Sequence, residues 1–151
     1  MLTFRLGESV HALPIAAIEE VLPALPVEAI AQCPAFVRGV VFVRGHLIAV
    51  FSAAERLGLT QYRPPREPHI LCLRWKNRLV GLEVDEALDL VELRLAAVLS
   101  AADMATGPSM LKAVVEHQGQ IIRLLDPARL LSPGEAQGLE QLPTTQARTS
   151  S

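Results

Sequence analysis

The sequence predicts a mainly β protein built from two similar halves, and two observations carry this prediction. The first is a series of short runs in which apolar and polar residues alternate, separated by glycine or asparagine turns, as is typical of antiparallel hairpins. The second is a self-match: residues 40–51 fall on 114–125 at an offset of 74, and residues 2–15 fall on 71–84 at an offset of 69. Each half would hold only about 65–70 residues, so we expect the two to pack against each other through an apolar interface.

Composition and charge restrict the possible functions. Of the 151 residues 50% are apolar and 20% are charged, which is typical of one globular domain. The formal net charge of −2 argues against a nucleic-acid binder, which needs a basic face. No apolar run reaches the roughly 18 residues of a membrane span, and the first five residues lack the pattern of a signal peptide. We therefore expect a cytoplasmic protein that neither binds nucleic acid nor inserts into the membrane.

The first half of the chain reads as two hairpins and a short helix. Prolines separate the hairpins, and Pro26 is expected to open a helical turn through Gln32. Ser52 and Glu55 form a capping box for a short helix that Gly58 ends. The expected strands are Leu2–Leu6 and Val10–Ile15 around a turn at 7–9, and Gly39–Val43 and Leu47–Phe51 around a turn at 44–46.

The second half repeats this order after a stiff, proline-containing connection at 60–69. Asp126 and Pro127 are expected to start a short helix through Leu131. We predict one domain at 1–132, a disordered tail at 133–151, and two units formed by 2–58 with 120–131 or by a similar division. The expected strands are Ile70–Trp75, a long strand Leu79–Leu93 that bends past Asp85, and a hairpin Lys112–Leu125, with a loop at 94–109 before the hairpin.

Residues that could carry chemistry are scattered, and no nucleotide-binding, metalloprotease or hydrolase motif occurs. Cys33 and Cys72 are interpreted as small buried apolar residues, with a disulfide or a metal site as the alternatives. Glu83 and Asp85 alternate with apolar residues, which favours a solvated strand face over a general acid–base pair. His11, His46, His69 and His117 stand singly, so we interpret them as surface or turn residues and predict no metal, cofactor or enzymatic activity.

Two features favour a protein that binds other proteins. Arg44 lies within an apolar hairpin and Glu20 beside an apolar strand end, so these charges either sit on the surface or pair across the sheet. Several apolar residues either fill the core or line an exposed groove. These residues are Ile18, Val21, Leu22, Leu88, Leu90 and Val91.

The order of the motifs resembles the CheW-like family of chemotaxis coupling proteins. The resemblance spans about residues 2–132, and it rests on five segments in the right order. They are Phe4-Arg5-Leu6-Gly7; Ala12-Leu13-Pro14-Ile15 with Ile18-Glu19-Glu20-Val21; Cys33-Pro34-Ala35-Phe36-Val37-Arg38-Gly39-Val40-Val41 with Val43-Arg44-Gly45; Leu79-Val80-Gly81-Leu82-Glu83-Val84-Asp85; and the closing stretch Ile121 to Leu131.

This resemblance implies two small five-stranded β-barrels around a shared apolar core, a few short helices and no catalysis. It implies an adaptor that links the cytoplasmic tip of a methyl-accepting chemoreceptor to the regulatory domain of a CheA-type histidine kinase. Carried over by position, the partner-binding residues would be Ile18, Glu20, Gly39, Arg44 and Leu90.

The chain also departs from the family pattern. Phe42 stands where the family usually has asparagine, Ala49-Val50 replaces Pro-Val, and Ser52 replaces aspartate. An adaptor of an accessory pathway, governing pili, surface sensing or a second messenger, is therefore an alternative to the main flagellar coupling protein. A small β-barrel enzyme or ligand carrier is a further alternative, which an enclosed polar pocket would favour over a shallow apolar groove between two barrels.

Overall fold

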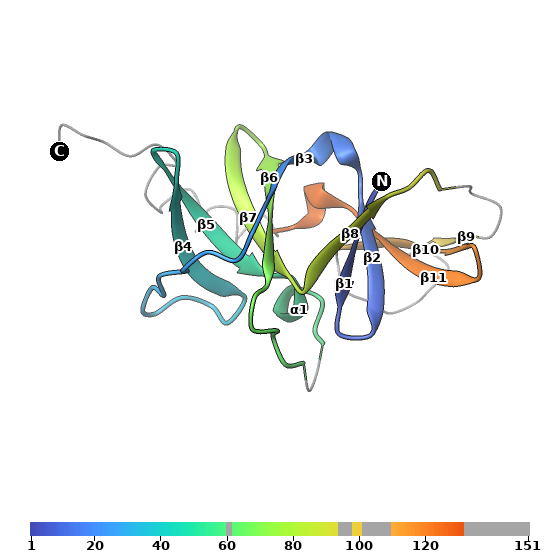
Figure 1. Cartoon of the computed structure of the whole chain (residues 1–151), viewed down its shortest axis with the longest axis horizontal. Coiled ribbons are helices and arrows are strands. Elements are labelled where there is room, and N and C mark those ends of the chain that lie inside the picture. Colours follow the sequence, from blue (N-terminus) through green and yellow to red (C-terminus); the bar gives the residue numbers. More distant parts are fainter. Residues whose placement is uncertain (60–61, 94–97, 101–109, 132–151) are drawn as a thin grey trace.

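A computed structural model of the chain describes residues 1–59, 62–93, 98–100 and 110–131, and shows two β-sheets packed side by side (Figure 1). The six-stranded sheet contains β1 (Leu2–Leu6), β2 (Ser9–Leu13), β8 (Glu86–Leu90), β9 (Val98–Ser100), β10 (Leu111–His117) and β11 (Gln120–Leu125). The five-stranded sheet contains β3 (Ile18–Leu22), β4 (Val37–Val43), β5 (His46–Ser52), β6 (His69–Trp75) and β7 (Arg78–Val84). The short helices are η1 (Ile15–Ala17), α1 (Ala53–Arg56) and η3 (Pro127–Arg129).

Both sheets are mixed, and the prediction of a mainly β fold is confirmed. The strand orders are β8-β1-β2-β11-β10-β9 and β3-β6-β7-β5-β4. In each sheet one parallel pair, β2 with β11 or β7 with β5, joins two antiparallel hairpins. The smaller sheet has the expected five strands, and the larger carries the extra three-residue strand β9. The counterpart of β9 in the smaller sheet is a single bridge between Glu28 and Val40.

The strand register follows the internal repeat. Pairs in β1–β2 recur in β6–β7 at an offset of 69, and pairs in β4–β5 recur in β10–β11 at an offset of 74. The β4–β5 and β10–β11 hairpins also have register shifts at equivalent positions, between 37 and 39 in the first and between 111 and 113 in the second. Examples are Phe4–His11 with Leu73–Val80, Phe42–Leu47 with Glu116–Ile121, and Ile18–Leu73 with Ala87–Phe4.

The helix caps repeat as well. The Ser52 Oγ accepts a hydrogen bond from the Glu55 amide at 3.1 Å, and the Asp126 Oδ1 accepts one from the Ala128 amide at 3.0 Å. Each cap satisfies an amide that the short helix itself leaves without a partner. The predicted N-caps at both positions are confirmed, whereas the return half of the capping box is not formed, because the Ser52 amide donates to the Phe36 carbonyl oxygen at 2.7 Å.

The division of the chain between the sheets differs from the predicted one. The five-stranded sheet takes one continuous stretch, 18–84, whereas the six-stranded sheet takes the two ends, 2–13 and 86–125. Both ends of the chain enter the six-stranded sheet because β2 pairs in parallel with β11, which lies near the C-terminal end of the described residues. The predicted long strand breaks at Asp85, where the chain leaves β7 in one sheet and enters β8 in the other.

Two further predictions of local structure have clear outcomes. The helical turn expected from Pro26 is wrong, because the backbone of Glu28 forms two hydrogen bonds of 2.9 Å with Val40 that keep this segment extended. In the loop expected at 94–109, residues 98–100 form β9. The rest of that loop and the tail at 133–151 lie outside the described residues.

Three apolar clusters hold the sheets together. The largest lies between the sheets, with Phe4 and Leu13 from one and Phe51, Leu71 and Leu82 from the other, so the predicted apolar interface is confirmed. The other two clusters each belong to one sheet, so each sheet buries apolar side chains on both faces. None of the helices in the described part of the chain is long and apolar enough to cross a membrane.

Candidate partner-binding surface

Glu20 and Arg44 form an ion pair between the two edge strands of the five-stranded sheet. Glu20 lies on β3, and Arg44 lies in the turn between β4 and β5, where its φ of 51° falls in the left-handed region. The Arg44 Nη1 donates a hydrogen bond to the Glu20 Oε1. The Arg44 side chain is 71% exposed and that of Glu20 is 31% exposed. Of the two readings of these charges, pairing across the sheet is therefore the one observed, and the arginine stays open to a partner.

The neighbouring residue on β3 forms a second ion pair. The Arg74 Nη2, on the adjacent strand β6, donates to the Glu19 Oε2, and both side chains are largely exposed. The register of β3 against β6 shifts between Ile18 and Glu20, and the charges of Glu19, Glu20 and Arg44 all act on the Cys72 thiol, so the two similar pairs lie near each other. The Glu19–Arg74 pair serves below as a matched control for the Glu20–Arg44 pair.

Gly39 acts through the backbone. It is buried on β4 with a φ of +144°, and a Cβ built there would lie 2.0 Å from the carbonyl oxygen of Glu28. Only glycine allows the segment before β4 to approach this closely. Gly39 therefore positions Glu28 against Val40 and offers no side chain to a partner.

The remaining predicted residues, Ile18 and Leu90, lie on different sheets. Ile18 starts β3 and is half-buried against the core between the sheets. Leu90 ends β8 and is 70% exposed. The structure thus places Ile18 and Glu20 on β3, with Arg44 paired to Glu20, and leaves Leu90 on the edge strand β8 of the other sheet. Of the apolar residues that were either core or groove, Leu22 is core, whereas Val21, Leu88 and Leu90 are exposed.

The carboxylates at the end of β7 are buried, and the expectation of a solvated strand face is wrong. The Glu83 Oε1 lies 3.3 Å from the Arg38 Nε, and burial raises the pKa of Glu83 although Arg38 opposes the shift. The Asp85 Oδ2 accepts hydrogen bonds from the Gly7 amide at 2.8 Å and from the Arg5 Nη1 at 3.1 Å. Both carboxylates are paired, so removal of Arg38 or Arg5 would leave a buried carboxylate without its cationic partner near the crossing between the sheets.

Tyr62 completes this polar group at the crossing. Its hydroxyl donates a hydrogen bond to the Asp85 Oδ1. Burial first, and then this hydrogen bond, raise the pKa of Tyr62 above its usual value. Tyr62 and Arg5 come from segments far from β7 in the sequence, so the alternating pattern of β7 carried no signal of these partners.

His11 is also buried, contrary to the expectation of a surface or turn residue. Its side chain stacks on Phe4, and neither ring nitrogen has a hydrogen-bond partner among the residues that the structure describes. Burial, and to a smaller extent the charge of Arg123, lower the pKa of His11 to about 4. Burial of a neutral imidazole without hydrogen bonds lowers the stability of the fold. It does not by itself indicate a metal ligand. No group of three or more metal-binding side chains occurs among the described residues.

The two cysteines of the chain are free. Cys72 is buried on β6, and burial raises its pKa to about 11. Cys33 is half-buried. A thiol with so high a pKa is a poor nucleophile, so Cys72 behaves as the small apolar core residue that was predicted.

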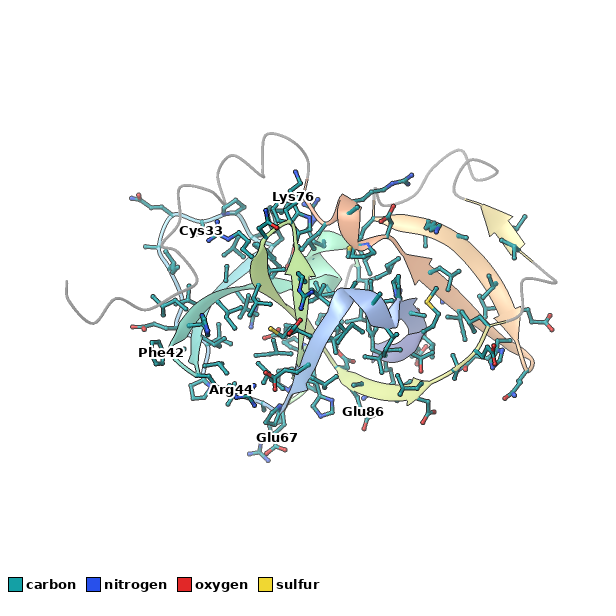
Figure 2. All side chains as sticks on the ribbon, turned by 90° about the horizontal axis from the view of Figure 1, so that it is seen from above. Cys33, Phe42, Arg44, Glu67, Lys76 and Glu86 are labelled. Carbon is teal, nitrogen blue, oxygen red and sulfur yellow. The ribbon has the colours of Figure 1, made fainter. Side chains whose placement is uncertain are left out.

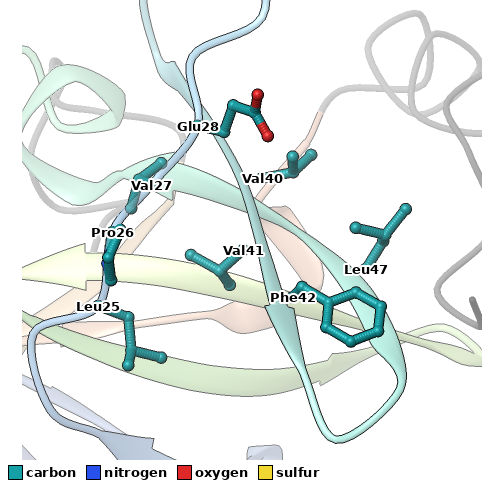
Figure 3. Close-up of a pocket in the computed structure, with 8 residues that line it drawn as sticks. All are labelled: Leu25, Pro26, Val27, Glu28, Val40, Val41, Phe42 and Leu47. Carbon is teal, nitrogen blue, oxygen red and sulfur yellow. The ribbon is translucent and has the colours of Figure 1, made fainter.

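An open apolar groove lies on the outer side of the β4–β5 hairpin (Figure 3). Its volume is about 460 Å³, and residues 25–28 form one wall while Val40, Phe42 and Leu47 form the other. The groove belongs to one sheet, whereas the sequence suggested a groove between two units. A second depression of about 560 Å³ has polar walls that include Arg5, Arg66 and Asp85, and it is also open to solvent.

Comparison with known proteins identifies the family. The model of the CheW-like domain matches residues 1–135, a range that includes all of the residues that the structure describes. The chain belongs to the CheW-like domain family. This family consists of non-catalytic scaffolds and adaptors of chemotaxis signalling, which confirms the prediction that the protein is not an enzyme.

Named relatives agree with this assignment. The chemotaxis protein CheW of Rhizobium meliloti is 27% identical over 128 residues, which cover 83% of each chain. The CheW of Treponema pallidum is 24% identical over 94% of this chain and 87% of its own. The scaffolding protein TtCheW of Thermoanaerobacter tengcongensis superposes with a TM-score of 0.77 over 85% of this chain and 89% of its own, at 19% identity, which shows a shared fold.

Proposed function

We propose that this protein couples the cytoplasmic tip of a chemoreceptor to the regulatory domain of a CheA-type histidine kinase. The supporting observation is the ion pair between Glu20 and Arg44. It stands at two positions that the family resemblance assigns to the receptor groove, on an exposed sheet edge beside Ile18. Membership in a family of scaffolds supports the adaptor role, and the protein would act in the cytoplasm at receptor arrays.

The exposed pair is better suited to binding than to holding the fold. A solvent-exposed ion pair contributes only about 0–1 kcal/mol to folding, because water screens it and both side chains lose freedom. A charge desolvated at an interface can contribute about 2–5 kcal/mol to binding, because its removal leaves a partner unpaired. Loss of Arg44 should therefore affect binding much more than stability.

The experiment compares Arg44→Ala with Arg74→Ala, which breaks the neighbouring exposed pair of β3 and β6. Each variant is tested in a melting curve and in co-sedimentation with a receptor cytoplasmic fragment and the kinase. We expect both variants to melt within a few degrees of the wild type, and only Arg44→Ala to weaken receptor capture, by at least about tenfold. Undiminished capture, or a large loss of thermal stability in Arg44→Ala, would reject a binding role for the pair.

The side chain of Phe42 supports a role of the protein in an accessory signalling pathway. This side chain is 62% exposed at the position where the family usually has asparagine, two residues before Arg44 on the same hairpin (Figure 2). An exposed aromatic residue beside the proposed site changes which partner surface fits. We therefore expect stronger capture by the receptor tip of a pili, surface-sensing or second-messenger pathway than by a flagellar chemoreceptor of the same cell. Stronger capture by the flagellar chemoreceptor would assign the protein to the main pathway.

A further inference from the structure

A histidine side chain connects the five-stranded sheet to the edge strand of the six-stranded sheet. His69 is the first residue of β6, and its Nδ1 accepts a hydrogen bond of 2.8 Å from the backbone amide of Ala87 on β8. The starts of β6 and β8 lie together where the chain crosses from one sheet to the other (Figure 1). Because β8 is an edge strand that pairs only with β1, the His69 ring supplies an acceptor that no neighbouring strand provides.

This hydrogen bond joins the two parts of the predicted receptor surface. β6 pairs directly with β3, which carries Ile18 and Glu20. β8 carries Leu90, three residues beyond Ala87. Loss of the contact between His69 and Ala87 would therefore let Leu90 move relative to the residues on β3.

The hydrogen bond also requires one protonation state of the ring. A ring nitrogen accepts a hydrogen bond only while it carries no proton, and a protonated imidazole has two donors and no acceptor. Imidazole is the side chain that commonly changes its charge near neutral pH. A proton on Nδ1 of His69 would set two N–H donors against each other and break the contact with Ala87.

The surroundings of His69 give solvent access to the ring. His69 is half-buried and borders the depression of about 560 Å³, whose rim carries Glu67 and Glu86 in Figure 2. On β7 the apolar Val84 lies opposite His69, and on β3 the apolar Leu22 lies opposite the next residue of β6. The titratable and charged groups that line the depression together with His69 are Arg5 on β1, Arg66 and Glu67 in the segment before β6, Asp85 at the crossing, and Glu86 on β8.

We infer that His69 is a positioning residue whose protonation releases the start of β8, so that the protein binds its receptor more weakly at acidic pH. The inference rests on the proposed adaptor function and adds a pH-dependent control to it. Receptor affinity is highest while Nδ1 holds the Ala87 amide. It falls in proportion to the fraction of molecules in which β8 has moved.

Nitrogen NMR of the histidine rings tests the contact without any partner. At about pH 8 the His69 Nδ1 should have the chemical shift of an unprotonated nitrogen that accepts a hydrogen bond. At about pH 5.5 it should carry a proton, and the Ala87 amide should lose protection against hydrogen exchange. A proton on Nδ1 at about pH 8 would overturn the inference, whichever partners the protein binds.

Two substitutions of His69 separate the hydrogen bond from the change of charge. His69→Asn offers an amide oxygen in place of Nδ1 and cannot gain a proton, whereas His69→Leu removes the acceptor. Capture of a receptor cytoplasmic fragment is measured at about pH 8 and about pH 5.5. We expect wild-type capture to weaken about five- to tenfold at the lower pH, His69→Asn to stay within about twofold of its value at the higher pH, and His69→Leu to be weak at both.

His46→Asn is the matched control, because His46 lies two residues from Arg44 and could impose a pH dependence of its own on the receptor surface. This variant should keep the wild-type pH dependence. Circular dichroism and melting curves at both pH values establish that each variant is folded, because His11 lowers the stability of the fold in the same range.

Each other outcome has a definite meaning. Wild-type capture that does not vary with pH would overturn the inference, and so would a His69→Asn variant with the wild-type pH dependence. Loss of that dependence in His46→Asn would assign it to the turn beside Arg44 and overturn the inference equally. Wild-type protein that captures no receptor at either pH would instead reject the proposed function, even where NMR shows the contact between His69 and Ala87.

Discussion

The five-stranded and six-stranded sheets share one backbone plan but carry different side chains at equivalent positions. In the five-stranded sheet the edge strands are joined by the ion pair of Glu20 and Arg44, whereas the equivalent residues of the six-stranded sheet, Asp89 and Gln118, cannot form one. Arg44 and Gln118 have nearly the same φ, 51° and 52°. The turn geometry therefore does not depend on the arginine. Comparison of the two sheets thus separates features that the fold requires, such as the turn conformation, from features that only one sheet has, such as this ion pair.

At one pair of equivalent core positions, the polar residue lies in the six-stranded sheet. Val80 of the five-stranded sheet is fully buried between the sheets, and its equivalent in the six-stranded sheet is His11, which is 2% exposed. The buried His11 imidazole is without a hydrogen-bond partner among the described residues, so protonation of this ring would place an unpaired charge in the core of the six-stranded sheet. Thus the five-stranded sheet carries the candidate binding features, and the six-stranded sheet carries a sensitivity to acid.

The largest expected effect tests whether the sheets unfold together. Val41 and its equivalent Val115 are both buried, each inside its own sheet. Substituting either by aspartate buries an unpaired charge, which should cost about 3–5 kcal/mol and abolish partner capture. Denaturant unfolding should show one transition for both variants, because the large cluster joins the sheets. Two separate transitions would show that the sheets are independent units.

The next effect concerns His11 and pH. Its pKa is about 4 in the folded protein, against 6.5 for an ordinary histidine, so below pH 6.5 the unfolded chain binds a proton that the folded chain does not. Stability should therefore fall as the pH drops from about 6.5 to 4, by about 3 kcal/mol at most. His11→Val, which copies Val80, should remove most of this fall in urea titrations at pH 7 and pH 4.5. An unchanged pH profile in the variant would assign the acid sensitivity to another group.

Substitutions at Gly39 and Ala113 should give smaller losses of stability that differ in size. Gly39→Ala places a Cβ against the Glu28 carbonyl and should cost about 2–3 kcal/mol. Ala113→Gly, at the equivalent position of β10, should cost only about 0.5–1 kcal/mol, through the greater freedom of the unfolded chain. Chemical denaturation of the two variants measures this difference. Equal costs would mean that the close approach of Glu28 is not what requires glycine.

The smallest expected effect is that of Arg44→Gln, which copies the turn of the six-stranded sheet. Because Gln118 adopts the same backbone conformation, the variant should lose only the exposed ion pair, about 0–1 kcal/mol. The melting temperature measures this cost. A loss well above 1 kcal/mol would show that the pair closes the edges of the sheet as a structural element.

Much of the fold could be predicted because its signals are local. Alternation, glycine turns and the two caps depend on residues close in sequence, and the offsets of 69 and 74 reappear in the strand register. The candidate surface was predicted less completely. The resemblance placed Glu20 and Arg44, but nothing in the sequence indicated that Gly39 acts through Glu28, because that segment was expected to be helical.

The sequence by itself determined the class of strands, the repeat, the caps and the family, since period-two alternation and short-range hydrogen bonds need no distant partner. The tertiary structure decided which segments share a sheet and which charges are buried. Glu83 and Asp85 alternate with apolar residues as solvated residues would, yet they are buried because the five-stranded sheet packs apolar clusters on both faces. Their partners Arg38, Arg5 and Tyr62 arrive from other elements, and only the folded arrangement of strands brings these opposite charges and hydrogen-bond donors together.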